Sequence, residues 1–199
     1  MTNLSHMPPI RDQLGRALRD LRISVMDRCN FRCVYCMPED KFHPGFKFLP
    51  SKERLSFDEM LRLVRIFTKL GVSKIRITGG EPLLRVNLTD FIGDLSTIDK
   101  IKDIALTTNG VLLKKYAYEL RASGLDRITV SLDSIDPHEF KLMTGGRGDL
   151  DRVLSGIDEA QRAGFKDIKI NAVIKKGVNE NNILKMVEYF RDQPVILRF

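Results

Sequence analysis

Six short runs of apolar, largely β-branched residues alternate with amphipathic segments along this chain, and this alternation restricts the fold more than any other feature. The runs cover residues 21–26, 74–78, 103–107, 127–132, 167–173 and 195–199. Parallel strands need a crossover connection, usually a helix, so the pattern predicts parallel βα units. Such units build either a doubly wound sheet or an incomplete, six-stranded (β/α) barrel, and the pattern alone does not choose between them.

The first long amphipathic segment carries the boundary residues of a helix. Ser56 and Glu59 have the spacing of a capping box, Met60 and Val64 lie on one helical face, and Gly71 marks the end. Similar stripes predict further helices at 112–124, 150–164 and 183–190, and an N-terminal helix over about 10–20. We expect one domain over residues 1–199, since no linker or repeat interrupts the pattern.

The charge balance favours anionic ligands. Lys and Arg total 33 against 26 Asp and Glu, a net charge of +7. The basic residues are dispersed and form no RNP-like motif, so we expect no nucleic-acid partner. No apolar run approaches the roughly 20 residues of a membrane span, and the first residues lack a secretory signal. We therefore expect a soluble, cytoplasmic protein without a membrane partner; a homodimer is compatible with the sequence, which does not define the oligomeric state.

The only cysteines of the chain, Cys29, Cys33 and Cys36, fall within eight residues in CxxxCxxC spacing. Three thiolates can hold three irons of a [4Fe–4S] cluster and leave the fourth iron open to a ligand. Zinc is the alternative, with His43 as a fourth ligand, and unligated thiols are a third interpretation. The odd number disfavours a disulfide framework.

Polar residues follow four of the predicted strands, where the carboxyl ends of parallel strands would share one rim. Gly80 would let the backbone approach a ligand, and Glu81 could accept hydrogen bonds from a ligand ammonium group. Taken alone, the Gly-Gly-Glu-Pro motif is more often a turn than a binding site, and only its position after a strand favours binding. The loop of residues 37–55, which starts at the cysteines, is long enough to be functional. The rim segments are the cysteine loop, Thr78-Gly-Gly-Glu-Pro82, Thr107-Thr-Asn-Gly110 and Ser131-Leu-Asp-Ser134.

Four basic residues, Arg22, Arg76, Lys169 and Arg198, lie within predicted strands. Arg76 and Lys169 each stand between two isoleucines, so each should face the side opposite its apolar neighbours. Inside a barrel a cation is costly unless an anionic partner meets it. A solvated face of the sheet is the alternative interpretation.

Several motifs in one order resemble the radical S-adenosylmethionine (SAM) superfamily, and within it the GTP 3′,8-cyclases of molybdenum cofactor biosynthesis. The resemblance covers nearly all of the chain from Arg22 onward, and it implies an incomplete (β/α)6 TIM-type barrel. The motifs are Cys29-Asn-Phe-Arg-Cys-Val-Tyr-Cys-Met-Pro, Arg76-Ile-Thr-Gly-Gly-Glu-Pro-Leu-Leu-Arg, Leu106-Thr-Thr-Asn-Gly, Val130-Ser-Leu-Asp and the closing Leu197-Arg-Phe.

The resemblance implies a lyase that cleaves SAM reductively to a 5′-deoxyadenosyl radical and converts GTP to 3′,8-cyclo-7,8-dihydro-GTP, with a reductant as electron donor. No catalytic side chain is implied beyond the cluster and SAM. Carried over by motif position, Cys29, Cys33 and Cys36 bind the cluster; Tyr35, Gly80 and Ser131 contact SAM, with Glu81 as a further partner; Arg22, Arg76, Thr107 and Lys169 contact GTP.

The family continues past the equivalent of Phe199, with a second three-cysteine cluster, substrate-binding arginines and a Gly-Gly tail. Because the sixth apolar run reaches no stop signal at Phe199, we expect a chain truncated at its C-terminus. Two alternatives remain open: a different radical SAM enzyme with one cluster, and an inactive metal- or nucleotide-binding fragment.

Overall fold

The computed structural model describes residues 10–199, in which six strands form one parallel sheet; the polar residues 1–9 lie outside the described part. The strands follow one another in space in the order β1-β2-β3-β4-β5-β6. This order is that of an incomplete (β/α) barrel, because a doubly wound sheet reverses its strand order. The strands are β1 Asp20–Ser24, β2 Lys74–Thr78, β3 Asp103–Thr108, β4 Arg127–Ser131, β5 Ile168–Asn171 and β6 Val195–Arg198.

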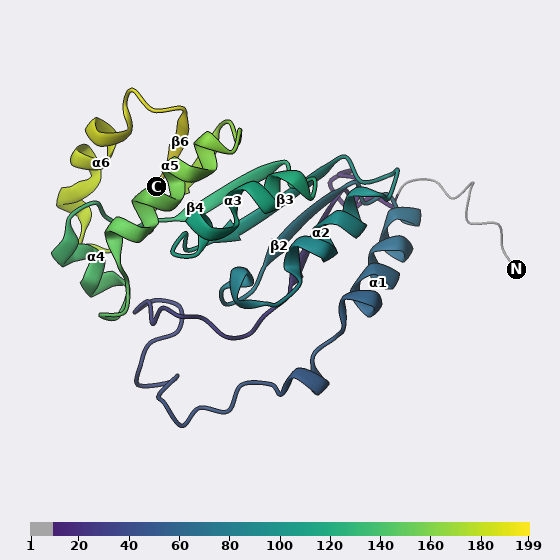
Figure 1. Ribbon diagram of the computed structural model, residues 1–199, viewed down its shortest axis with the longest axis horizontal. Coiled ribbons are helices and arrows are strands. Elements are labelled where there is room, and N and C mark those ends of the chain that lie inside the picture. The colour runs from purple at the N-terminus through teal and green to yellow at the C-terminus, as the bar shows by residue number, and fades with distance from the viewer. Residues whose placement is uncertain (1–9) are drawn as a thin grey trace, which may run out of the picture.

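The helices lie along one side of the sheet (Figure 1). They are α1 Phe57–Lys69, α2 Leu88–Ser96, α3 Leu113–Ala122, α4 Pro137–Met143, α5 Leu150–Arg162 and α6 Ile183–Phe190, with 3-10 turns at Ser51–Glu53, Pro82–Leu84 and Glu180–Asn182. Within residues 10–199 no helix has the length and apolar character that crossing a bilayer requires. The amphipathic stripes predicted α1, α3, α5 and α6, whereas α2 and α4 were not expected.

Helix α1 begins and ends as the sequence predicts. The Ser56 hydroxyl accepts the Glu59 backbone N–H at 3.2 Å, and the Glu59 carboxylate accepts the Ser56 N–H at 2.7 Å. This reciprocal pair satisfies donors that the first turn leaves free. Gly71 then takes a positive φ of 111°, which ends the helix, and Met60 and Val64 are buried against the sheet side.

The two faces of the sheet differ in chemistry. In β2, Ile75 and Ile77 are buried, whereas Arg76 between them is exposed. The same alternation holds in β5, where Ile168 and Ile170 are buried beside a half-exposed Lys169. Side chains alternate across a strand, so the apolar set packs under the helices and the polar set lines the opposite side, which we call the inner face.

The prediction of an N-terminal helix over residues 10–20 is wrong. Instead Arg11 and Ala17 form an antiparallel bridge around a turn. The Asp12 carboxylate accepts the backbone N–H groups of Leu14 and Arg16, and Gly15 has a positive φ of 76°. An aspartate that bonds its own backbone and a left-handed glycine both favour a turn over a helix.

We expect Phe91→Ala to lower the free energy of unfolding by about 3–5 kcal/mol, because it empties a large volume in the core. Phe91 is 1% exposed and stacks on Phe57, with ring centroids 4.4 Å apart and planes at 11°. Urea denaturation measures the loss. Tyr118→Ala, at an exposed position on α3, is the control and should change stability by about 0.5 kcal/mol or less. Equal losses in the two variants would contradict this packing.

Candidate active site at the carboxyl ends of the strands

The cysteine loop runs directly against the loop that follows β2. The Gly80 N–H donates to the Met26 carbonyl, and the Glu81 N–H donates to the Arg28 carbonyl at 2.8 Å. A Cβ at Gly80 would lie 2.5 Å from the carbonyl carbon of Arg28 and 3.0 Å from the Cys29 nitrogen. The sequence suggested that Gly80 makes room for a ligand. The structure shows that it also makes room for the backbone leading into Cys29.

One cavity of about 200 Å³ collects most of the predicted site residues. The residues expected to hold the cluster and SAM all line it, together with one of those expected to contact GTP. The prediction of a shared rim is thus confirmed for these positions. The predicted residues in its lining are Cys29, Cys33, Cys36, Tyr35, Gly80, Glu81, Ser131 and Thr107.

The three cysteines are free thiols around this cavity. Burial raises the pKa of Cys29, and burial together with the nearby Asp133 raises the pKa of Cys33 to about 12. Without a metal the thiols of Cys29 and Cys33 keep their protons, and metal binding would release them. Three thiols around one cavity fit a [4Fe–4S] cluster, in which each cysteine ligates a different iron.

The zinc interpretation needs His43 as a fourth ligand beside the three cysteines. His43 is not among the residues that line the cavity shared by the cysteines. It lines a neighbouring cavity together with Cys29, and its Nδ1 accepts the Gly45 N–H at 3.2 Å. Between residues 10 and 199 no three His, Cys, Asp or Glu side chains, the cysteines included, form a preformed group for a metal ion.

Tyr35 connects the cysteine loop to the ends of β4 and β5. Its hydroxyl donates to Asp133 Oδ2 at 2.8 Å, while Asp133 Oδ1 accepts the Val173 N–H at 2.9 Å. Burial raises the pKa of Asp133. The sequence predicted Tyr35 as a SAM contact, and the structure places it in the cavity lining with its hydroxyl already engaged. Asp133 had appeared only as part of a rim motif.

Glu81 joins the loops that follow β2 and β3. Its Oε1 accepts Thr108 Oγ1–H at 2.7 Å and the Leu83 N–H at 3.1 Å, and its Oε2 accepts the Asn109 N–H at 2.7 Å. The residue is 1% exposed, and burial raises the pKa of its carboxyl. A carboxylate has about four acceptor positions, so three bonds leave room for one further donor. Glu81 thus holds the two rim loops together through hydrogen bonds.

A turn after α4 supports the cysteine loop, and sequence reasoning missed it. The Arg32 N–H donates to the Thr144 carbonyl and the Val34 N–H to the Met143 carbonyl, each at 3.1 Å. Gly145 has a positive φ of 64°, and a side chain there would overlap the Arg32 backbone. The adjacent glycines at 145 and 146 were the only sequence signal that two backbones could approach here.

The predicted GTP contacts share the inner face of the sheet. Arg22 pairs in register with Arg76, and Thr107 and Lys169 both pair with Thr129. Residues in register on parallel strands point to the same side. The pKa of Lys169 is lowered by burial and then by the nearby Arg198, Arg127 and Arg76, whereas Asp103 raises it. Arg127 is itself paired with Asp103. Lys169 therefore lies near other cations on this face, and a bound anion would stabilise such a group.

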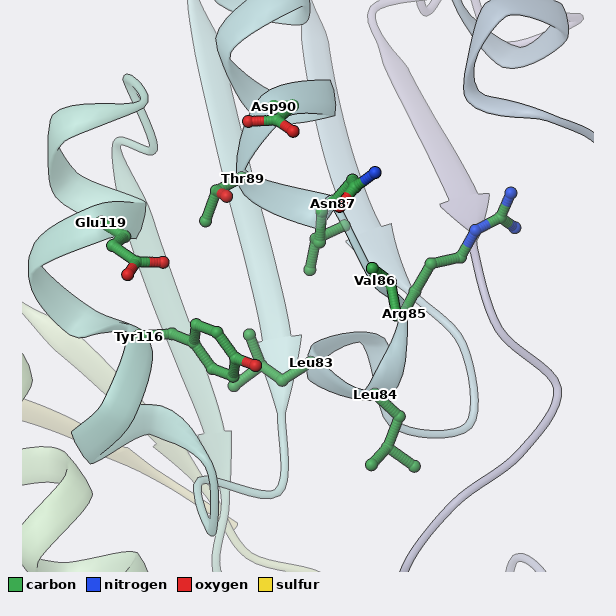
Figure 2. A pocket seen from close by; sticks show the side chains of 10 residues that line it. Leu83, Leu84, Arg85, Val86, Asn87, Thr89, Asp90, Tyr116 and Glu119 are labelled. Atoms are coloured by element: carbon green, nitrogen blue, oxygen red, sulfur yellow. The ribbon is translucent and has the colours of Figure 1, made fainter.

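A second cavity, of about 260 Å³, lies on the helical side of the fold (Figure 2). Tyr116 and Glu119 of α3 line it opposite Thr89 and Asp90 at the start of α2. Its lining, within the described chain, includes no cysteine and no residue of the rim segments. None of the predicted site residues therefore lies in this second cavity.

The comparison with protein families identifies the class to which this site belongs. The profile of the radical SAM superfamily matches residues 23–190. The match spans every strand except β6 and part of β1, together with the whole cysteine loop. The chain therefore belongs to the radical SAM superfamily, whose members use an iron–sulfur cluster and SAM.

Curated relatives are GTP 3′,8-cyclases. That of Xanthomonas campestris pv. campestris (strain 8004) is 53% identical over 191 residues, which cover 96% of this chain and 56% of the relative. That of Acidothermus cellulolyticus is also 53% identical, over 96% of this chain and 53% of the relative. That of Staphylococcus haemolyticus is 51% identical over 190 residues. The chain spans about half the length of these relatives.

Solved structures show the same fold. Methylornithine synthase (PylB) superposes with a TM-score of 0.66 at 14% identity, over 90% of this chain and 54% of that protein. The enzyme anSMEcpe, solved with bound AdoMet and the Cp18Cys peptide, superposes with a TM-score of 0.63 at 17% identity, over 90% of this chain and 50% of its own. The α/β fold with a partial TIM-type barrel is thus confirmed.

Proposed function

We propose that this chain is the N-terminal, radical SAM part of a GTP 3′,8-cyclase, a lyase that converts GTP to 3′,8-cyclo-7,8-dihydro-GTP in molybdenum cofactor biosynthesis. The observation that carries the proposal is the strand register, which places the predicted GTP contacts on one face of the sheet, beside the cavity of the three cysteines. Identity above 50% to cyclases along nearly the whole chain supports it.

The cavity residues would hold the cofactors. Cys29, Cys33 and Cys36 would ligate three irons of one [4Fe–4S] cluster, leaving the fourth for SAM. When bound, the reduced cluster and SAM supply a 5′-deoxyadenosyl radical, with the electron coming from an external reductant. Tyr35, Gly80, Ser131 and the free acceptor position of Glu81 would orient SAM. The buried residues of the lining, such as Phe31 and Phe140, would keep water from that side of the cavity.

The inner face would hold the substrate. Arg22, Arg76 and Lys169 offer charged donors for the triphosphate and ribose oxygens of GTP, and Thr107 offers a hydroxyl that lies both on this face and in the cavity lining. Thr107 thus joins the cofactor cavity to the cations. In this arrangement the ribose would lie toward the cavity and the triphosphate along the sheet, and the protein's contribution would be positioning.

The proposal is tested by assaying 5′-deoxyadenosine after anaerobic reconstitution with iron and sulfide and addition of dithionite and SAM. We expect formation of 5′-deoxyadenosine to increase with GTP but not with ATP. Cys33→Ala, which removes one predicted iron ligand, is the control and should abolish formation. Cleavage that ignores GTP would favour a different single-cluster radical SAM enzyme. An intact cluster without any SAM cleavage would indicate an inactive metal-binding fragment.

A further inference from the structure

We propose that Asn109 is a positioning residue for the cluster, because its side-chain amide donates a hydrogen bond to the sulfur of Cys29 and thereby raises the reduction potential. The inference rests on the proposed function in one respect, that Cys29 ligates a cluster. It assigns to the loop after β3 a role that is independent of GTP and SAM.

Both polar atoms of the Asn109 side chain form hydrogen bonds in the structure. Its Nδ2 donates to Asn30 Oδ1 at 2.7 Å and to Cys29 Sγ at 3.8 Å, and its Oδ1 accepts the Val111 N–H at 3.2 Å. An amide nitrogen has two protons, so one can be donated to Asn30 and the other to the Cys29 sulfur. The bond to Asn30 fixes the orientation in which the second proton points at Cys29.

The backbone of Asn109 is held equally firmly. Its N–H donates to Glu81 Oε2 at 2.7 Å, and Glu81 is itself bound to Thr108. Asn109 is 8% exposed and Glu81 is 1% exposed, so water competes little for these bonds. A continuous set of hydrogen bonds, buried at Glu81 and partly buried at Cys29, therefore runs from the loop after β2, through Asn109, to the first cysteine.

Hydrogen bonds to a ligating sulfur affect the two oxidation states of a cluster differently. The reduced cluster carries one more electron, part of which resides on sulfur, so an N–H donor stabilises the reduced form more. Cys29 Sγ also accepts the Phe31 N–H at 3.4 Å. That backbone donor survives any side-chain substitution, whereas the Asn109 donor is removed by Asn109→Ala.

The test is the midpoint potential of the reconstituted protein, followed by EPR in an anaerobic titration without SAM or GTP. We expect Asn109→Ala to make reduction about tenfold less favourable, which is a shift of about 59 mV to more negative potential for one electron. Asn182→Ala is the matched control, because Asn182 is also buried and its side chain is also hydrogen-bonded, with Oδ1 accepting the Ile135 N–H at 3.2 Å, yet neither Asn182 nor Ile135 lines the cavity of the cysteines. This control should keep the parent potential.

Asn30→Ala is a second variant for the case in which Asn109→Ala does not load a cluster. It removes the acceptor that orients the Asn109 amide. We expect the midpoint potential to shift in the same direction by about half as much, which is about a threefold change in the reduction equilibrium constant. A reduction equilibrium constant within twofold of the parent's in whichever variant loads, or an equal shift in Asn182→Ala, would overturn the inference. If the parent protein holds no cluster, the proposed function fails together with the inference. If the parent holds a cluster and only the expected shift is missing, the inference alone fails.

Discussion

Gly80→Ala is expected to abolish loading of the iron–sulfur cluster while leaving the sheet folded. The added methyl group would lie 2.5 Å from the carbonyl carbon of Arg28 and 3.0 Å from the nitrogen of Cys29. Both are backbone atoms, which cannot move aside as a flexible side chain does. Overpacking of this kind costs about 1–3 kcal/mol, and here the displacement falls on the segment that positions Cys29.

The measurement is iron and sulfide content together with the visible absorbance of the reconstituted protein, alongside circular dichroism for the fold. Gly93→Ala is the matched control: Gly93 lies within α2, and a Cβ there would have no neighbour within 4 Å. The Gly93→Ala protein should load the cluster normally, and the alanine should stabilise the helix by up to about 1 kcal/mol. A fully loaded Gly80→Ala protein would show that the close contact between the two loops is not required.

The strand pattern was predicted well because it depends on local sequence. Burial under the helices selects β-branched residues at alternate positions, so runs such as Ile75 and Ile77 are visible without any knowledge of neighbours. Two helices were not predicted, and the reasons lie in their local sequence. Helix α2 starts after Asn87 in a left-handed conformation, without a side-chain cap, and α4 has only seven residues. For α4, the cap Asp136 and the following Pro137 were readable signals that the periodicity alone did not use.

The position of the candidate site was predicted through one general rule, that the carboxyl ends of parallel strands share a rim, whereas the roles of its individual residues came from the family resemblance. That rule placed Gly80, Thr107 and Ser131 together with the cysteines, and the cavity confirms it. It could not predict partners that depend on the path of the chain. The support that the turn at Thr144 gives to the cysteine loop comes from a segment more than a hundred residues later, and its geometry exists only in the folded protein.

Arg76→Ala is expected to weaken GTP binding by about 10- to 100-fold without changing iron content, because one charged hydrogen bond contributes about 1.5–3 kcal/mol. Arg76 lies on the inner face, is exposed there and does not line the cavity of the three cysteines. Equilibrium dialysis of GTP against the anaerobically reconstituted protein measures the change. Arg62→Ala removes the same charge from the exposed side of α1 and should bind GTP as the parent does. Equal affinity in the two variants would place GTP elsewhere; a loss confined to Arg76→Ala would assign the inner face to the substrate.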